Sequence, residues 1–457
     1  MQFLNQKETI CALSTAQGMG AIALIRLSGD QAIAITEKIF SKSLADKPTH
    51  TAHFGRIKKG DELIDEVVVT LYLNPGSFTG EDIVEIACHG SVFIQEQILE
   101  LLIENGARMA GPGEFSLRAF MNNKMDLSQT EAIADLISAN SRAAHKVAMH
   151  QMRGGFSKEI NELREGLLNF ASLVELELDF SQEDVEFADR EQLTDLVKQV
   201  KAKVSSLLHS FKLGNVIKNG VPVAIVGSPN AGKSTLLNTL LNEEKAIVSD
   251  IAGTTRDVIE DTIVLNGVEF RFIDTAGIRE TQDTIENLGI ERAFDQLRKA
   301  AVVLLLIDLS DVTEEFALTQ IAKFTESVNE EEQTLIPVFN KVDEVDLNAY
   351  AALTGKGVFI SAKKKENISE LIERLGATVG DYGKEDQTIV TNARHYEILR
   401  KCEISLVKVE EGLDLQIPGD LLAMDIRETL YHLGEITGQI TTDDLLGNIF
   451  ANFCIGK

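Results

Sequence analysis

The sequence contains few cysteines and no long hydrophobic run. Its four cysteines (Cys11, Cys88, Cys402 and Cys454) are far apart and form no C-x-x-C pair. This spacing argues against a zinc ribbon or a disulfide framework and suits a reducing compartment. The longest apolar run, AAVVLLLI, is far shorter than the roughly 20 residues that a membrane-spanning helix needs. The first residues, MQFLNQKETICAL, have no basic stretch followed by an apolar one, so we expect no signal peptide. We therefore expect a soluble, cytoplasmic protein.

Basic residues are also scarce. Lys and Arg number 44 against 71 Asp and Glu, which gives a formal net charge of −27. Such a chain repels phosphates, so it is a poor candidate for coating nucleic acid without regard to sequence. It could still contact RNA through a local basic surface or through a basic partner protein. The length of 457 residues and a hydrophobic content of 44% predict two to four globular domains.

The pattern of elements changes three times along the chain. Strand-like runs (AIALIRLSG, EVVVTLYLN, DIVEIACHG) and one helical stretch predict an α+β domain over 1–120. From there to residue 213 there is no proline and only three glycines, and an apolar stripe predicts long helices; its members are Ile160, Leu163, Leu167, Phe170, Val174 and Leu178. Residues 216–382 alternate strands and helices, which predicts a doubly wound, mostly parallel sheet. The tracts 121–215 and 383–457 then form one discontinuous helical domain around this insertion.

A phosphate-binding pattern opens the inserted module. GSPNAGKS, residues 227–234, fits G-x-x-x-x-G-K-[ST] and lies between the strand VAIV and the helix TLLNTLLN. Backbone N–H groups of such a turn can cradle phosphates. We expect Lys233 to reach the β- and γ-phosphates and the Ser234 hydroxyl to bind Mg²⁺.

Two later motifs predict that the base is guanine. In NKVD (340–343), the Asp343 carboxylate can accept from N1–H and N2–H₂ of guanine, whereas adenine has no donor at N1. SAK (361–363) supplies a backbone N–H for the guanine O6. Between the phosphate loop and these motifs, AGTTRD offers Thr255 as a second hydroxyl on Mg²⁺, and DTAG offers Asp274, which would hold the metal through water.

The residue after DTAG raises a question about the attacking water. In small signalling GTPases this place holds a glutamine that orients the water, but here it is Ile278, which forms no hydrogen bond through its side chain. From the residues alone, Glu280, Asp283 and Glu286 are all candidates for this role.

The motifs together resemble one family closely. GSPNAGKSTLLN, DIAGTTRD, DTAGIRE and LGIERA, with the flanking FTGEDIVEIACHG, GPGEFSLRAFMNNKMDLSQTEAIADLI and terminal CIGK, are similar to the MnmE (TrmE) family of tRNA-modification GTPases. The resemblance covers essentially the whole chain. It implies a dimerising N-terminal folate-binding domain, a helical domain in two tracts and an inserted G domain.

The resemblance also implies partners and chemistry. With the flavoprotein MnmG, such a homodimer adds an aminomethyl-type group to C5 of the wobble uridine of certain tRNAs, using a formyl- or methylene-tetrahydrofolate. The expected GTP contacts are Asn230, Ala231, Gly232, Lys233, Ser234, Thr235, Ser249, Asp250, Ile251, Ala252, Gly253, Thr254, Thr255, Asp274, Thr275, Ala276, Gly277, Asn340, Lys341, Asp343, Ser361, Ala362 and Lys363.

The resemblance assigns the remaining roles as follows. Glu286 would position the water, and K⁺ would replace an arginine finger, with ligands at Asn230, Ser249, Ile251 and Thr254. Arg256 and Arg279 are rival sources of positive charge. Folate would contact Arg26, Glu85, Lys124 and Lys457. Cys454 would take part in the modification chemistry, although a buried structural cysteine is an equal alternative.

Two other readings of the function stay open. The chain could be a GTP-gated switch in ribosome assembly or signalling, in which hydrolysis only resets affinity. The helical tracts could instead be a scaffold for self-assembly. A folate-like N-terminal domain and a reactive terminal cysteine favour the enzyme, because a switch would need neither.

Overall fold

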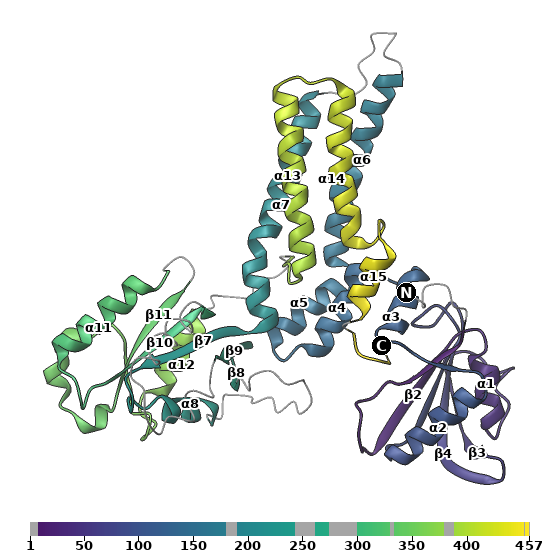
Figure 1. Ribbon diagram of the computed structural model, residues 1–457, viewed down its shortest axis with the longest axis horizontal. Coiled ribbons are helices and arrows are strands. Elements are labelled where there is room, and N and C mark those ends of the chain that lie inside the picture. Colours follow the sequence, from purple (N-terminus) through teal and green to yellow (C-terminus); the bar gives the residue numbers. More distant parts are fainter. Residues whose placement is uncertain are drawn as a thin grey trace. The chain divides into compact units, whose positions relative to one another are not determined.

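The computed structural model describes residues 8–179, 190–242, 261–273, 299–329, 333–378, 388–451 and 453–456 (Figure 1). The chain divides into two compact units. The first consists of Met1–Ala134, His150–Ala202 and Ile398–Lys457, and the second of Asp135–Met149 and Lys203–Glu397. The domain boundaries expected after residues 120, 215 and 382 stay predictions, because compactness is a different criterion from domain identity.

The N-terminal part of the first unit is a six-stranded sheet with the order β3-β4-β5-β2-β1-β6. Its elements are β1 (Ile10–Leu13), β2 (Ile22–Ser28), α1 (Ala32–Ile39), β3 (Thr51–Lys59), β4 (Glu62–Tyr72), β5 (Ile83–His89), α2 (Val92–Glu104) and β6 (Arg108–Met109). Neighbouring strands are antiparallel except β1 and β6. The predicted strands β2, β4 and β5 and the helix α2 are confirmed, as is the α+β class.

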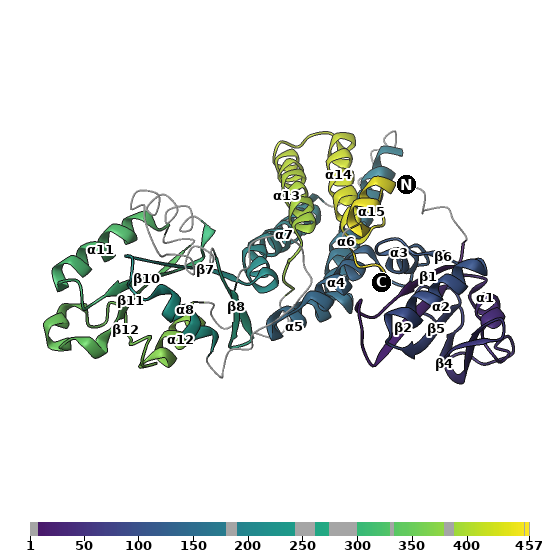
Figure 2. The same ribbon diagram turned by 60° about the horizontal axis from the view of Figure 1, so that its bottom comes forward.

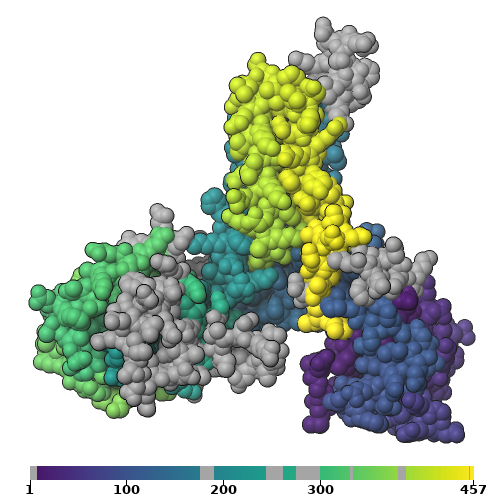
Figure 3. All heavy atoms as spheres, in the orientation of Figure 1, coloured from purple at the N-terminus to yellow at the C-terminus, as the bar shows by residue number. Residues whose placement is uncertain are grey.

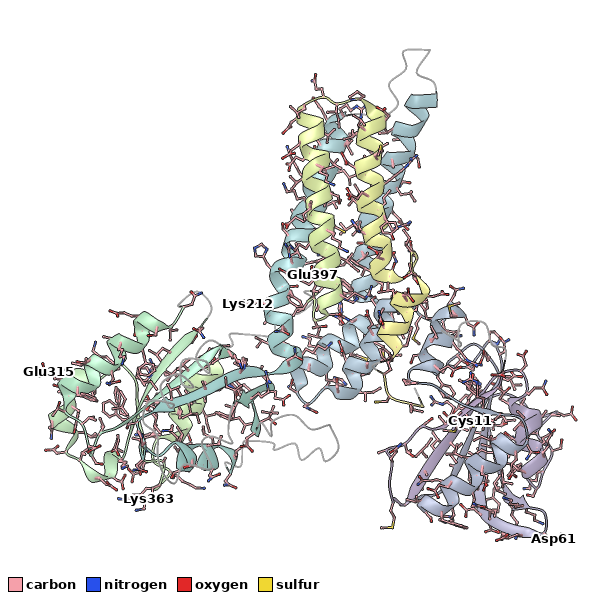
Figure 4. The ribbon with its side chains drawn as sticks, viewed as in Figure 1. Cys11, Asp61, Lys212, Glu315, Lys363 and Glu397 are labelled. Atoms are coloured by element: carbon pink, nitrogen blue, oxygen red, sulfur yellow. The ribbon has the colours of Figure 1, made fainter. Side chains whose placement is uncertain are left out.

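Two of the cysteines are part of this sheet's core. Cys11 lies within the sheet (Figure 4) and is fully buried, and Cys88 is 3% exposed. Burial raises the pKa of the Cys11 thiol to about 12 and that of Cys88 to about 11. Because the thiolate is the reactive form, both side chains act as small hydrophobic residues at neutral pH.

Long helices follow this sheet and return at the end of the chain. They are α3 (Glu114–Met121), α4 (Leu127–Ser138), α5 (Arg142–Met152), α6 (Gly155–Asp179), α7 (Arg190–Asn219), α13 (Ala393–Asp414), α14 (Gly419–Thr437) and α15 (Asp443–Phe450). Helices α6 and α14 lie side by side, and Figure 2 shows the same pairing from another direction. On α6, Ile160, Leu167, Phe170 and Val174 are buried and Leu163 is half-buried, which confirms the predicted stripe at these positions.

The end of the chain packs on the N-terminal part of the same unit. Ile455 forms a β-bridge with Pro112, and the Gly113 N–H donates to the Cys454 carbonyl over 3.3 Å. The Ser14 hydroxyl, directly after β1, donates to the Gly456 carbonyl over 3.2 Å. The contact between the yellow C-terminal segment and the blue and purple residues is visible in Figure 3.

The second unit contains another six-stranded sheet, with the order β12-β11-β10-β7-β9-β8. Its elements are β7 (Val221–Gly227), α8 (Lys233–Leu241), β8 (Asp261–Leu265), β9 (Val268–Phe272), β10 (Val302–Asp308), α11 (Glu314–Ser327), β11 (Thr334–Asn340), the 3₁₀ turns η1 (Val342–Glu344) and η2 (Leu347–Leu353), β12 (Val358–Phe359) and α12 (Ile368–Ala377). All paired strands are parallel except β8 and β9. One core layer includes α8 and α12, and the other includes α11. This confirms the predicted doubly wound sheet.

Parallel strands send their carboxyl ends to the same edge of a sheet, which is where doubly wound folds bind ligands. The loops after β7, β10, β11 and β12 therefore emerge together. Among the described helices of either unit, none is both long and apolar enough to cross a bilayer.

A buried carboxylate ties the N-terminal sheet to the first helix after it. Glu114 is 3% exposed and accepts from two nitrogens of Arg108, over 2.6 and 3.0 Å, and from the Gly111 N–H over 2.8 Å. Arg118, one helical turn later, donates to it over 3.1 Å. Burial alone would raise the pKa of Glu114, but Arg108, the Gly111 N–H and Arg118 hold it below its usual 4.5.

Replacing Glu114 with Gln should destabilise this unit in a pH-dependent way. A carboxyl whose folded-state pKa is depressed contributes stability above its unfolded-state pKa and loses it as pH falls through the folded value. We expect Glu114→Gln to lower the free energy of unfolding by roughly 2 kcal/mol at pH 7, and the deficit to shrink below pH 4.5. Urea unfolding followed by circular dichroism measures this. Glu104→Gln, at a carboxylate whose side chain is 50% exposed, is the control, and a deficit independent of pH would contradict the analysis.

Candidate nucleotide site and flanking sites

The phosphate loop has the backbone that its motif predicts. Strand β7 ends at Gly227 and α8 begins at Lys233. Between them, Asn230 and Gly232 have left-handed φ angles of 65° and 97°. A Cβ atom on Gly232 would lie 2.4 Å from the Asn340 side-chain nitrogen, so this position requires glycine for space as well as for conformation.

Lys233 closes back over the loop. Its ammonium donates to the carbonyls of Gly227 and Ser228, each over 2.8 Å. Burial lowers the pKa of Lys233, and no carboxylate is among the causes of this shift. A charged group held by neutral carbonyls in a partly dehydrated place gains from an anion nearby. The loop is therefore suited to a phosphate.

Asn340, at the end of β11, connects three of the loops on this edge. It is 3% exposed. Its amide nitrogen donates to the Ala231 carbonyl of the phosphate loop over 2.8 Å, and its amide oxygen accepts from the Ala362 N–H over 3.0 Å. The Ala362 carbonyl in turn accepts from Thr239 of α8 over 2.9 Å. The phosphate loop and the loop after β12 are thus fixed relative to each other.

Asp343, the predicted reader of guanine, has two partners. Its side chain is 8% exposed and lies 3.3 Å from the Lys364 ammonium. A hydrogen bond with the buried Ser361 and the charge of Lys364 hold the pKa of Asp343 below its usual range. The carboxylate is therefore ionised at neutral pH, which is the form that can accept two hydrogen bonds from guanine.

A hollow of about 380 Å³ lies between α8 and the loop after β12. Its lining residues are Thr235, Asn238, Thr239, Asn242, Ala362, Lys363 and Lys365. Lys363, at this edge in Figure 4, is exposed. The backbone after Lys233 and the SAK loop thus face a common space.

Lys341 and Asp308 form an ion pair between neighbouring strand ends. Asp308 ends β10 and stands opposite Asn340 in the strand register. Lys341 has a left-handed φ of 64°. Sequence reasoning identified the lysine and missed the aspartate, because no motif marks the end of β10.

Many expected site residues lie outside the described part of the chain. These are Ser249, Asp250, Ile251, Ala252, Gly253, Thr254, Thr255, Asp274, Thr275, Ala276, Gly277, Glu286 and Lys457. Their roles stay predictions. The same holds for the other candidates near the water, Glu280 and Asp283, and for Arg256 and Arg279.

Two predicted metal ligands are described. Ser234 is the second residue of α8 and Asn230 lies in the phosphate loop, and both are exposed. Their side-chain oxygens are neutral and hard, which suits Mg²⁺ or K⁺ beside a phosphate that supplies the negative charge. Over the residues that the structure describes, no group of three His, Cys, Asp or Glu side chains is placed to hold a metal by itself.

In the N-terminal sheet, Arg26 and Glu85 are directly paired. They face each other on β2 and β5, and Arg26 donates from two nitrogens to one Glu85 oxygen over 2.7 and 2.9 Å. The Arg26 guanidinium carbon is 5.8 Å from the ring centres of both Phe78 and Phe115. Burial and Glu85 raise the pKa of Tyr72, whose hydroxyl is hydrogen-bonded to that carboxylate. Sequence reasoning missed these three aromatic residues.

Lys124 and Cys454 are the other two flanking residues that the structure describes. Lys124 donates to the Pro75 carbonyl over 2.7 Å. Cys454 is exposed, so the alternative that it is a buried structural cysteine is wrong. Its neighbours in the chain pack against the end of β1, and Ala12 of β1 is opposite Arg26 in the sheet.

Replacing Asn340 with Ala should weaken both the stability of the site and its binding of nucleotide. The change leaves the Ala231 carbonyl and the Ala362 N–H without their partner, which costs roughly 2–4 kcal/mol. We expect a lower thermal unfolding temperature for the unit and weaker GDP binding, measured by calorimetry. Asn348→Ala removes an exposed amide from η2 that bonds only within its own turn, to Asp346, and should change neither quantity. Equal effects of the two variants would contradict the role of Asn340.

Known proteins match the chain over both flanks and the insertion. A family described as GTP-binding protein TrmE N-terminus matches residues 9–124, and one described as MnmE helical domain matches 127–454. Among solved structures, the G domain of the T. maritima FeoB iron transporter aligns over 36% of this chain and 99% of that chain, with 26% identity and a TM-score of 0.24. The fold itself rests on the strand order given above.

Two curated relatives cover nearly the full length. The chain is 54% identical over 458 residues to the tRNA modification GTPase MnmE of Cytophaga hutchinsonii, covering 99% of this chain and 98% of that protein. It is also 54% identical over 472 residues to the protein of that name from Bacteroides thetaiotaomicron, covering 99% and 100%. With this identity and coverage, and with the phosphate loop, NKVD and SAK on one edge of a parallel sheet, the chain belongs to the MnmE (TrmE) family.

Proposed function

We propose that this protein is an enzyme of tRNA modification that hydrolyses GTP to GDP and phosphate. The observation that carries the proposal is the arrangement around Asn340, which fixes a phosphate loop and a guanine-type base site on one sheet edge. The full-length similarity to proteins named tRNA modification GTPase MnmE gives this site its biological setting.

The described residues divide the binding of GTP between them. Lys233 and the N–H groups of the phosphate loop bind the β- and γ-phosphates, because these groups are the donors at the start of α8. Asp343 accepts from the guanine N1–H and N2–H₂. The SAK loop, which Asn340 holds through the Ala362 N–H, is the expected neighbour of the guanine O6. Adenine would leave the ionised Asp343 without donors, so the site discriminates by the penalty of an unpaired carboxylate.

Hydrolysis requires a water held in line with the γ-phosphate. Ile278 offers no hydrogen bond for this purpose, and we assign the role to Glu286, as the resemblance to the MnmE family implies. Ser234 and Thr255 would hold Mg²⁺, and Asn230, Ser249, Ile251 and Thr254 would hold K⁺. Fixed cations at the phosphates stabilise the negative charge that develops as the bond to the γ-phosphate breaks.

Steady-state GTP hydrolysis in matched KCl and NaCl tests this assignment. We expect faster turnover in KCl, and we expect Glu286→Ala to lose most of the turnover, about 100-fold or more by analogy with positioned acid–base groups, while still binding GTP. Glu280→Ala and Asp283→Ala are the matched controls. Equal, slow rates in both salts would favour a G domain that waits for an outside activator, and thus a regulatory switch.

The modification itself follows from the proposed partners. Together with an MnmG-type flavoprotein, the homodimer would add an aminomethyl-type group, such as carboxymethylaminomethyl, to C5 of the wobble uridine of certain tRNAs. A formyl- or methylene-tetrahydrofolate would supply the one-carbon unit. The proposed folate residues Arg26, Glu85, Lys124 and Lys457 and the proposed catalytic Cys454 belong to the first unit.

The chemistry of the Arg26 region supports a folate there. The guanidinium can meet a carboxylate or polar ring edge, Glu85 can accept from amino and ring N–H groups, and Phe78 and Phe115 offer aromatic faces beside them. The segment with the exposed Cys454 is held within the same unit, because Gly113 donates to the Cys454 carbonyl and Ser14 donates to the Gly456 carbonyl.

Adding 5-formyl-tetrahydrofolate should raise the thermal unfolding temperature of the protein, because a ligand of the native state stabilises it. At 100 times its Kd the ligand would add about 2.7 kcal/mol. Glu85→Gln should abolish the shift, whereas Glu66→Gln, at an exposed β4 carboxylate paired with Arg56, should retain it. No shift in the wild type, with GTP hydrolysis intact, would favour the switch over the folate-using enzyme.

A further inference from the structure

A charged side chain at the carboxyl edge of the second sheet, that of Asp308, belongs to no nucleotide motif. Asp308 is the last residue of β10 and its side chain is 7% exposed. One of its oxygens accepts from the Ser310 N–H over 2.9 Å and the Ser310 hydroxyl over 2.7 Å. The other oxygen pairs with the ammonium of Lys341. Both oxygens of this buried carboxylate are therefore used.

The pair is fixed at neutral pH. Burial alone would raise the pKa of Asp308, but Lys341 and Ser310 hold it below its usual range. The hydrogen bond to Asp308 raises the pKa of Lys341 above its usual range. The negative charges of Glu344 and Asp311 raise the pKa of Lys341 further, without a hydrogen bond to it. Both partners are ionised, so the ammonium has a defined place.

The fixed position of the Lys341 ammonium matters because of the unusual backbone conformation at Lys341. Lys341 follows Asn340 directly and has a left-handed φ of 64°, a conformation that a side chain other than glycine adopts only when its surroundings hold it. On one side, Asn340 is tied to Ala231 and Ala362. On the other, the Lys341 side chain is tied to Asp308. The position of Asp343, two residues later, therefore depends on the contacts of Asn340 and Lys341.

We infer that Asp308 is a positioning residue for the guanine nucleotide, acting through Lys341. This inference rests on the proposed function, since it concerns the same GTP site. Asp308 holds the lysine side chain along the sheet edge before the nucleotide arrives. The ordering of a long, flexible side chain is then part of folding and does not weaken binding.

A double-mutant cycle on GDP affinity tests the inference. Asp308→Asn keeps the shape and the Ser310 contacts but removes the charge, and Lys341→Met removes the ammonium. We expect each single variant to bind a fluorescent GDP analogue about tenfold more weakly, the size expected for one charged hydrogen bond. We expect the double variant to bind no more weakly than Lys341→Met alone, because Asp308 has nothing left to position.

Two results would overturn the inference. One is a double variant whose loss of GDP affinity equals the product of the fold losses in the two single variants. The other is wild-type affinity in Asp308→Asn. Asp311→Asn is the control: it removes a nearby exposed charge that makes no hydrogen bond to Lys341 and should bind GDP normally. Unfolding temperatures without nucleotide show whether each variant is folded.

A second variant keeps the test open if Asp308→Asn does not fold. Asp308→Glu retains the charge but moves the ammonium, so we expect affinity between wild type and Lys341→Met, and no change when it is added to Lys341→Met. Wild-type affinity, or a further loss in the double variant, would count against the inference. Absence of GDP binding by the wild type would refute the proposed function instead.

Discussion

The side-chain amide of Asn340 holds three loops of the nucleotide site in register. The parallel order of β12, β11, β10 and β7 brings those loops to one edge, but strand order alone does not set their spacing. The amide does so with one donor to the phosphate loop and one acceptor for the SAK loop. Because both bonds are buried, neither loop can move without leaving a polar group unpaired. The phosphate end and the base end of the site therefore behave as one rigid object.

Two lysines of the motifs have different electrostatic surroundings. Lys233 is held by neutral carbonyls and its pKa is lowered by burial, so an anion beside it would improve its environment. Lys341 is already neutralised by Asp308 and its pKa is raised. Of the two, Lys233 is the one with charge available for phosphate, and Lys341 is better placed to order the loop that precedes Asp343. The lysines of the two motifs thus have different physical roles.

The sequence was most informative where function demands a particular residue at a strand end. The phosphate loop, NKVD and SAK were placed correctly, because glycine, amide and carboxylate chemistry is specific there. Short pieces such as β1, α1 and β3 were not predicted, because segments of four to nine residues are too short to carry a clear periodic signal. The pairing of Asp308 with Lys341, and of Tyr72 with Glu85, depends on strand register between distant segments. Register is decided by tertiary packing, which no local pattern records.

The Arg26–Glu85 pair sets a condition on any ligand of the N-terminal sheet. The two side chains are only 21% and 15% exposed, so a ligand that separated them would leave a partly buried charge unpaired. Both hydrogen bonds from Arg26 go to a single Glu85 oxygen, from Nε and Nη2. The ion pair itself leaves Nη1 of the guanidinium outside it, and the Glu85 carboxylate also accepts from the Tyr72 hydroxyl. A ligand edge with an acceptor for Nη1 and a donor for the remaining lone pairs of the carboxylate can therefore bind the intact pair. The proposed folate meets this condition, since a pterin carries ring and amino N–H groups beside an exocyclic carbonyl oxygen.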